Sequence, residues 1–201
     1  MERLLLTIDR LSAGVGKAFA WCIVVLTFGV GYEVFMRYVL RAPTNWAFDI
    51  SYIMYGALFM MAGAYTLSRN GHVRGDVFYR LMPVRGQAAL DLALYVLFFF
   101  PTFITLLIYG IPYARQSWMF NEVSIYSPTG VPIYPSKTII PVAATLMLIQ
   151  GVGEVVRCIL AIRSGQWPQR LQDVEELESA ILHEQQDRAA AEAAQARGAA
   201  Q

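Results

Sequence analysis

Residues 50–68 constrain the fold more than any other stretch, because these 19 residues carry no formal charge. A helix rises about 1.5 Å per residue, so about 20 apolar residues suffice to cross the roughly 30 Å hydrocarbon layer of a bilayer. The chain then becomes strongly polar, with Arg69, His72, Arg74 and Asp76 in the eight residues that follow. This alternation predicts a transmembrane helix and hence an integral membrane protein.

The composition supports this class of protein. The chain is 56% hydrophobic and only 15% charged, whereas soluble domains carry about 25% charged residues. Its mean hydropathy is +0.43. A net charge of +1 gives no electrostatic basis for binding nucleic acid. Cys22 and Cys158 lack the spacing of a disulfide framework or a zinc site, and no cofactor motif is apparent. The 201 residues leave no room for a separate catalytic domain beside the spans.

The apolar runs predict an all-α integral membrane protein with four transmembrane helices. The predicted spans cover about residues 18–40, 48–68, 89–114 and 138–162, within a membrane domain of residues 17–163. Residues 1–16 place apolar side chains at helical spacing, which predicts an N-terminal amphipathic helix in the membrane interface. Residues 164–201 are polar and predict a partly disordered cytoplasmic tail.

Prolines and a long connection mark irregular points. Pro101 lies in the middle of the third span, where it removes a backbone hydrogen bond and should kink the helix. Pro141 is expected in the first turn of the fourth span, where proline is tolerated. The connection at residues 115–137 is rich in Pro, Gly and Tyr, which predicts an ordered, turn-rich loop lying on the membrane or on a partner.

The distribution of Lys and Arg predicts that both termini are cytoplasmic, because positive residues concentrate on that side of a membrane protein. Ten flank one side of the spans and four the other. The first group is Arg3, Arg10, Lys17, Arg69, Arg74, Arg80, Arg85, Arg157, Arg163 and Arg170. The second is Arg37, Arg41, Arg115 and Lys137.

Ionisable groups inside the spans are the first places to look for chemistry. Glu33 lies four residues before Arg37 on one helix face, so it forms either a structural ion pair or a proton or coupling-ion site; we favour the pair. Asp49 opens the second span, where a carboxylate suits the helix macrodipole. Glu154 and Arg157 form an i,i+3 pair at a helix end, and we interpret this pair as structural.

Small residues in the second span predict close helix contact. Gly56 and Gly63 lie seven residues apart on one face, which lets helices approach closely in lipid. Packing within the bundle and docking of a partner subunit are equally compatible with this face. His72 has no second ligand at suitable spacing for a metal site.

Several short motifs together resemble the small membrane subunit (DctQ-like) of tripartite ATP-independent periplasmic (TRAP) transporters. They are Arg37-Tyr38-Val39, Trp46 with Asp49, Gly63-Ala64-Tyr65, Gly71-His72-Val73-Arg74 and Asp76. Where the family more often has Glu, this chain has Asp49. The structural or subunit-interface candidates are therefore Glu33, Arg37, Trp46, Asp49, Gly56, Gly63, His72, Arg74 and Asp76.

The resemblance implies a multi-pass protein of the bacterial inner membrane. It implies a part in organic acid uptake driven by a sodium gradient. The implied partners are a large multi-span permease subunit, a periplasmic substrate-binding protein and membrane lipid. The small subunit would brace the large one, without enzymatic activity. The alternatives are a self-sufficient proton-coupled exporter that uses Glu33 and a membrane enzyme or redox anchor subunit.

Overall fold

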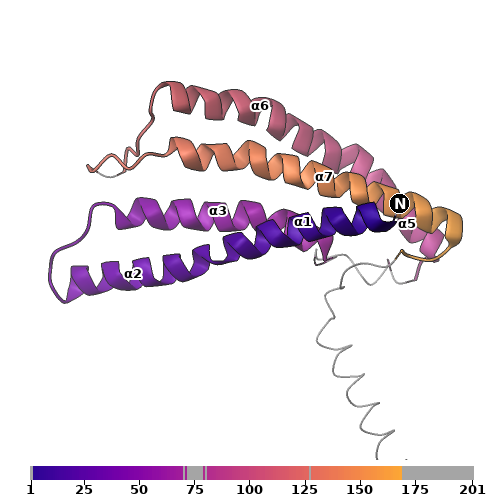
Figure 1. Cartoon of the computed structure of the whole chain (residues 1–201), viewed down its shortest axis with the longest axis horizontal. Coiled ribbons are helices and arrows are strands. Elements are labelled where there is room, and N and C mark those ends of the chain that lie inside the picture. Colours follow the sequence, from indigo (N-terminus) through magenta and orange to yellow (C-terminus); the bar gives the residue numbers. More distant parts are fainter. Residues whose placement is uncertain (1, 70, 72–78, 80, 127, 169–201) are drawn as a thin grey trace, which may run out of the picture. The chain divides into compact units, whose positions relative to one another are not determined.

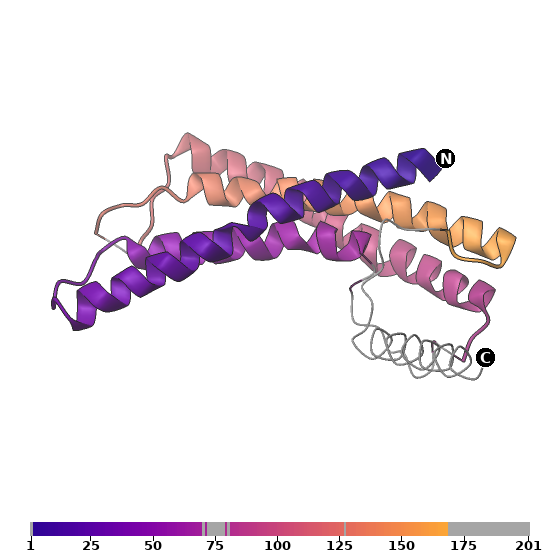
Figure 2. The same ribbon diagram turned by 60° about the horizontal axis from the view of Figure 1, so that its bottom comes forward.

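The computed structural model describes residues 2–69, 71, 79, 81–126 and 128–168 (Figures 1 and 2). The predicted tail from residue 169 onward and three candidate residues, His72, Arg74 and Asp76, lie outside the described residues. The helices are α1 (Glu2–Ala20), α2 (Cys22–Tyr38), α3 (Ala47–Ser68), α5 (Val84–Leu94), α6 (Phe100–Met119) and α7 (Tyr134–Ser164). A π-helical turn, η1 (Tyr95–Phe99), joins α5 to α6.

Four helical segments are long and apolar enough to cross a membrane, which confirms the four predicted spans. They are Leu5–Tyr38, Ala47–Ser68, Val84–Met119 and Tyr134–Ser164. The described part of the chain forms no strand, only an isolated antiparallel bridge between Val123 and Pro132. The third and fourth segments extend beyond their predicted limits, because helical hydrogen bonding continues through the polar residues that flank each apolar run.

The N-terminal helix differs from the prediction. α1 does not end near residue 16 but continues to Ala20, and only Trp21 separates it from α2. Figure 2 shows the two helices following one another as a nearly continuous rod. α1 packs against α3 and α7, so one of its faces is covered by protein. Its position in the membrane interface stays a prediction.

α7 is the centre of the packing. It contacts α6, α3, α5 and α1, whereas α2 packs mainly along α3 (Figure 1). Ala64 and Leu67 of α3 and Met147 of α7 form a buried apolar cluster. Aromatic side chains from η1 and α6 close over this cluster, among them Phe99 and Phe103, whose ring centroids lie 4.6 Å apart.

Two glycines let helices approach closely. A Cβ atom added at Gly16 would lie 2.4 Å from Cβ of Tyr65, and one at Gly151 would lie 2.4 Å from Cε1 of Phe99. α1 therefore needs a glycine against α3, and α7 needs one against η1. Neither position was singled out from the sequence.

The two glycines of the predicted small-residue face have different surroundings within the chain. A Cβ at Gly63 would lie 3.3 Å from Sδ of Met147, so this position packs against α7. A Cβ at Gly56 would meet nothing within 4 Å. The two glycines share a face of α3, but α7 diverges from that face before it reaches Gly56.

The prolines act differently from one another. Pro101 follows η1, and the N–H of Phe100 donates to the carbonyl of Tyr95, an i→i+5 bond. The predicted disruption thus takes the form of a π-turn, which widens the helix where the proline ring would meet a carbonyl. The prediction for Pro141 was wrong, because α7 begins at Tyr134 and carries Pro135 in its first turn. Pro141 lies inside the helix, as such prolines do in spans whose neighbours satisfy the backbone.

The connection between α6 and α7 is turn-rich, as predicted, but shorter than residues 115–137. α6 ends at Met119, and Asn121, two residues beyond it, lies in the left-handed region (φ 46°). The N–H of Glu122 donates to the carbonyl of Ser117 over 3.0 Å. This is a Schellman ending. The N–H of Ser124 donates to the carbonyl of Val131 over 2.8 Å, which folds residues 120–133, here the connecting loop, into a hairpin-like turn.

Candidate functional site

A buried polar network joins α1 to α7. α1 contributes Asp9 and Ser12, and α7 contributes Gln150, Glu154 and Arg157. Each of these residues is at most 2% exposed. The three residues of α7 lie four and three positions apart and therefore stack on one helix face. The interior between these helices thus holds charged groups where apolar packing would be expected.

The guanidinium of Arg157 is the centre of this network. Its Nη2 lies 2.5 Å from Oδ2 of Asp9, and its Nη1 lies 2.5 Å from Oε1 of Glu154. Nε2 of Gln150 donates to Oδ1 of Asp9 over 2.9 Å and to Oε1 of Glu154 over 3.4 Å. The hydroxyl of Ser12 donates to Oε1 of Gln150 over 2.8 Å. Both helices are therefore held in one register by directional bonds.

The sequence predicted only part of this network. The contact between Glu154 and Arg157 is confirmed, but the interpretation of Arg157 as a residue at a helix end understated its burial. Arg157 is fully buried, and it is the one buried cation among the residues that the structure describes. Asp9 and Gln150 were missed, although a carboxamide and two charges stacked on one face of an apolar span were a usable signal.

The electrostatics of the network are unsuited to an organic anion. Two carboxylates surround a single guanidinium, which gives the three side chains a formal charge of −1 when all are ionised. Both terminal nitrogens of Arg157 already bind carboxylate oxygens. Its Nε has no hydrogen-bond partner, but it is buried among the same groups. What the arrangement can do is fix α1 against α7.

Glu33 forms the predicted contact with Arg37 and one further contact. Nε and Nη2 of Arg37 lie 2.9 and 2.5 Å from Oε1 of Glu33. The other oxygen, Oε2, accepts the backbone N–H of Thr44 over 3.0 Å and also the Thr44 hydroxyl. Both carboxylate oxygens are thus occupied, and the side chain is 14% exposed. Glu33 fastens the turn between α2 and α3 onto α2.

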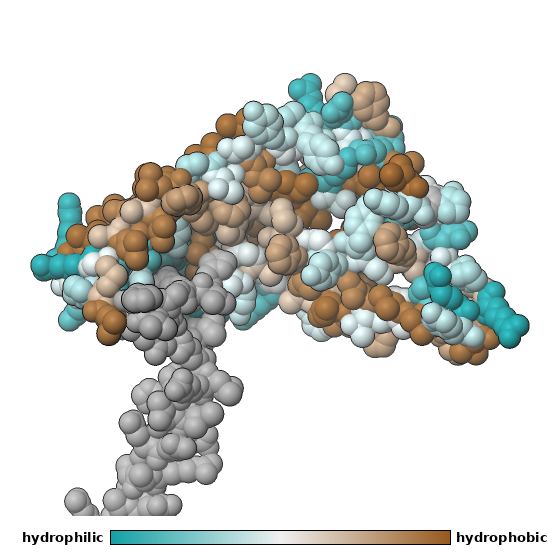
Figure 3. Space-filling model, turned by 180° about the vertical axis from the view of Figure 1, so that it is seen from behind, coloured by the Kyte–Doolittle hydropathy of each residue, from teal (hydrophilic) through white to brown (hydrophobic). Residues whose placement is uncertain are grey.

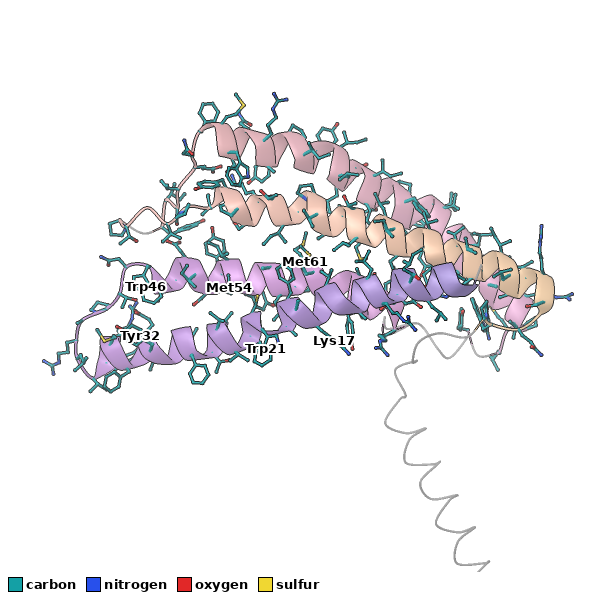
Figure 4. All side chains as sticks on the ribbon, viewed as in Figure 1. Lys17, Trp21, Tyr32, Trp46, Met54 and Met61 are labelled. Carbon is teal, nitrogen blue, oxygen red and sulfur yellow. The ribbon has the colours of Figure 1, made fainter. Side chains whose placement is uncertain are left out.

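Aromatic and acidic residues make further contacts at the N-terminal end of α3. The rings of Tyr32 and Trp46 stack with centroids 6.1 Å apart and planes inclined by 22°, as Figure 4 shows at the ends of α2 and α3. Asp49 is fully buried, and its Oδ1 accepts the hydroxyl of Ser124 over 2.6 Å. The sequence predicted only the favourable helix start for Asp49, whereas the structure makes it the anchor of the connecting loop.

A cavity of about 900 Å³ lies between α3, α6 and α7, next to the connecting loop. Gly56 lines this cavity, which explains why no atom lies near a Cβ added there. At its polar end Nζ of Lys137 lies 2.5 Å from Oε2 of Glu122 and 4.2 Å from the ring centroid of Tyr113. The hydrogen bond from Lys137 holds the pKa of the Glu122 carboxyl below its usual value.

In the part of the chain that the structure describes, these features define a helical, multi-pass membrane protein in which Arg157 is paired with carboxylates of the same chain. Among the described residues no group of three or more His, Cys, Asp or Glu side chains could hold a metal ion. The chain belongs to the family of the DctQ component of tripartite ATP-independent periplasmic transporters, and the family model matches residues 10–161. The family resemblance is thus confirmed, and DctQ is the small permease component of these transporters. No curated protein matched the chain.

Proposed function

We propose that this chain braces a large multi-span permease subunit in the bacterial inner membrane, in a system that takes up organic acids. A periplasmic substrate-binding protein would deliver the acid, and the large subunit would bind and move it. The small subunit would be required for transport without binding the substrate itself. The membership of residues 10–161 in the DctQ family supports the assignment to the small permease component.

The state of Arg157 is the observation that carries the second half of this proposal. Binding an organic acid in a membrane requires a positive partner or oriented backbone donors that are not already engaged. Arg157 is the one buried cation in the described part of the chain, and it holds Asp9 and Glu154 at 2.5 Å each. An anion would have to displace a carboxylate from it, so this network disfavours acid binding.

The surface of α2 supports a bracing role. None of its side chains is buried, and Phe28 and Tyr38 are 75% and 76% exposed. Apolar residues spread over the face seen in Figure 3, with hydrophilic residues gathered toward its ends. Such surfaces are covered by lipid or by a partner's helices. A partner that binds only the folded chain would also stabilise that chain by mass action.

The exporter alternative has no supporting observation. A coupled exporter should present an unpaired carboxylate near the middle of the bilayer. Both oxygens of Glu33 accept hydrogen bonds from Arg37 and Thr44 at the end of α2. The geometry favours a structural role for this residue.

Copurification and calorimetry test the proposal. The tagged chain should copurify with the large permease, and the reconstituted complex with its binding protein should transport the acid. The chain purified alone should give no heat of binding with that acid. Saturable binding to the isolated chain would overturn the assignment, and a chain that never associates with a permease would overturn the bracing role.

The membrane orientation is part of the proposal. The bias of ten Lys and Arg against four supports cytoplasmic termini. Reporter fusions at the C-terminus and within the connecting loop distinguish the two orientations. A periplasmic C-terminus would reverse the layout and place the connecting loop in the cytoplasm.

A further inference from the structure

The cavity beside the connecting loop changes in polarity along the helix axes. The part farther from the connecting loop is apolar and is lined by Met60 of α3 and Leu106 of α6. At the loop end it meets Lys137 and Glu122. The lining of α3 advances by single turns from Tyr52 through Gly56 to Met60, about 12 Å along the axis at 1.5 Å per residue. The cavity therefore has an apolar body and a charged end.

The charged end is a matched ion pair and not a lone cation. Nζ of Lys137 lies 2.5 Å from Oε2 of Glu122, and the two side chains are 15% and 39% exposed. An ammonium has three donor hydrogens and a carboxylate has several acceptor sites, so each group can bind a further partner. A ligand bearing only a negative charge would meet the Glu122 carboxylate beside the Lys137 ammonium, which opposes it.

A zwitterionic headgroup fits this pair. Its phosphate would accept hydrogen bonds from Lys137, while its ammonium would donate to Glu122. The volume, about 900 Å³, falls at the upper end of the roughly 300–1,000 Å³ typical of small-molecule sites. The apolar walls around Gly56 suit acyl chains, and they run in the direction of the helices, as the chains of a bilayer lipid do.

We propose that this cavity is a binding site for one phospholipid with a zwitterionic, primary-amine headgroup, of the phosphatidylethanolamine type. Its acyl chains lie between α3 and the pair α6 and α7, and its headgroup lies against Lys137 and Glu122. The lipid fills the space that α3 and α7 leave between them beyond Gly63. The connecting loop, held by Asp49, forms one wall of the headgroup site. This site is independent of the transport role proposed above.

Gly56 offers a sharp test, because a larger side chain there projects into open space and not into the protein. Gly56→Leu should fill part of the cavity while leaving the fold intact, since leucine also favours helix over glycine. Gly31→Leu on α2 is a matched control, because a Cβ at Gly31 also meets nothing within 4 Å. The full chain, purified in mild detergent, is examined by native mass spectrometry after equal exposure to phosphatidylethanolamine and phosphatidylglycerol.

The wild-type chain and Gly31→Leu should retain phosphatidylethanolamine, and Gly56→Leu should lose it. Lys137→Gln should retain the lipid about tenfold less well, because a charge-assisted bond to the phosphate is removed. Equal retention by wild type and Gly56→Leu would overturn the site, and equal binding of phosphatidylglycerol would overturn the headgroup assignment. A wild-type chain that retains no lipid, with Gly56→Leu losing a copurifying permease, would assign the cavity to a partner's helix and overturn the proposal.

Discussion

Replacing Arg157 with leucine should leave two carboxylates facing one another between α1 and α7. Asp9 and Glu154 each lose a contact of 2.5 Å to the guanidinium, and both are at most 1% exposed. Leucine fills part of the vacated volume, so the loss is chiefly electrostatic. Water does not reach the two groups in the folded chain, and burial of unpaired charge is costly.

The expected destabilisation is about 3–5 kcal/mol, the cost of removing one partner from a buried ion pair. The value should fall at the upper end, since a single substitution here removes the cationic partner of two carboxylates. The same substitution at Arg163, which is exposed on the same helix, should change the free energy of unfolding by no more than about 0.5 kcal/mol. The difference between the two variants isolates burial from helix propensity.

The assay is unfolding of the purified chain by a denaturing detergent in mixed micelles, followed by circular dichroism. A triple variant, Asp9→Asn, Glu154→Gln and Arg157→Leu, removes all three charges and keeps polar groups for Gln150. It should recover most of the stability, because coupled residues are not additive. The reasoning fails if Arg157→Leu unfolds at the same denaturant concentration as wild type, or if the triple variant loses the sum of its single effects.

Three further changes test the other contacts. Glu33→Gln should lower the yield of the assembled complex, and adding Arg37→Gln should partly restore it, measured by size-exclusion chromatography; an unchanged yield with lost ion coupling would favour the exporter. Ser124→Ala should destabilise the chain by about 1–3 kcal/mol, because the buried carboxylate of Asp49 loses a hydrogen-bond donor. The connecting loop should then be cleaved faster in limited proteolysis, and unchanged protease resistance would contradict this. The pKa of Glu122 is lowered in the folded chain, chiefly by the hydrogen bond from Lys137. The pair therefore stabilises the fold at pH values above 4.5, the ordinary pKa of this carboxyl. This contribution is lost as the pH falls through the lowered pKa of the folded chain. A Glu122→Gln variant should therefore remove that acid-side loss from the pH profile of stability, and identical profiles would refute it.

Local sequence was sufficient for features that depend on neighbours along the chain. The length of an uncharged run decides whether a helix can cross a bilayer, so the four spans followed from the sequence. The spacing of Glu33 and Arg37 places them on one face of one helix, and the structure brings them together. Composition likewise predicted the turns between α6 and α7. The limits of helices were harder, because helical hydrogen bonds continue past the apolar run, and Pro141 was consequently misplaced.

The contacts that lock the helices together depended on tertiary structure. Asp9 and Arg157 are 148 residues apart in the chain, and Asp49 and Ser124 are 75 apart. Periodicity shows which residues share a helix face, but it does not show which face meets which helix, and all faces of an apolar span look alike to lipid. Periodicity likewise places Gly56 and Gly63 on one face of α3, but it does not show that only Gly63 packs against α7. The sequence by itself determined four spans and their local pairs, whereas only the packing of α7 among its neighbours decided which charges are buried and where a cavity remains.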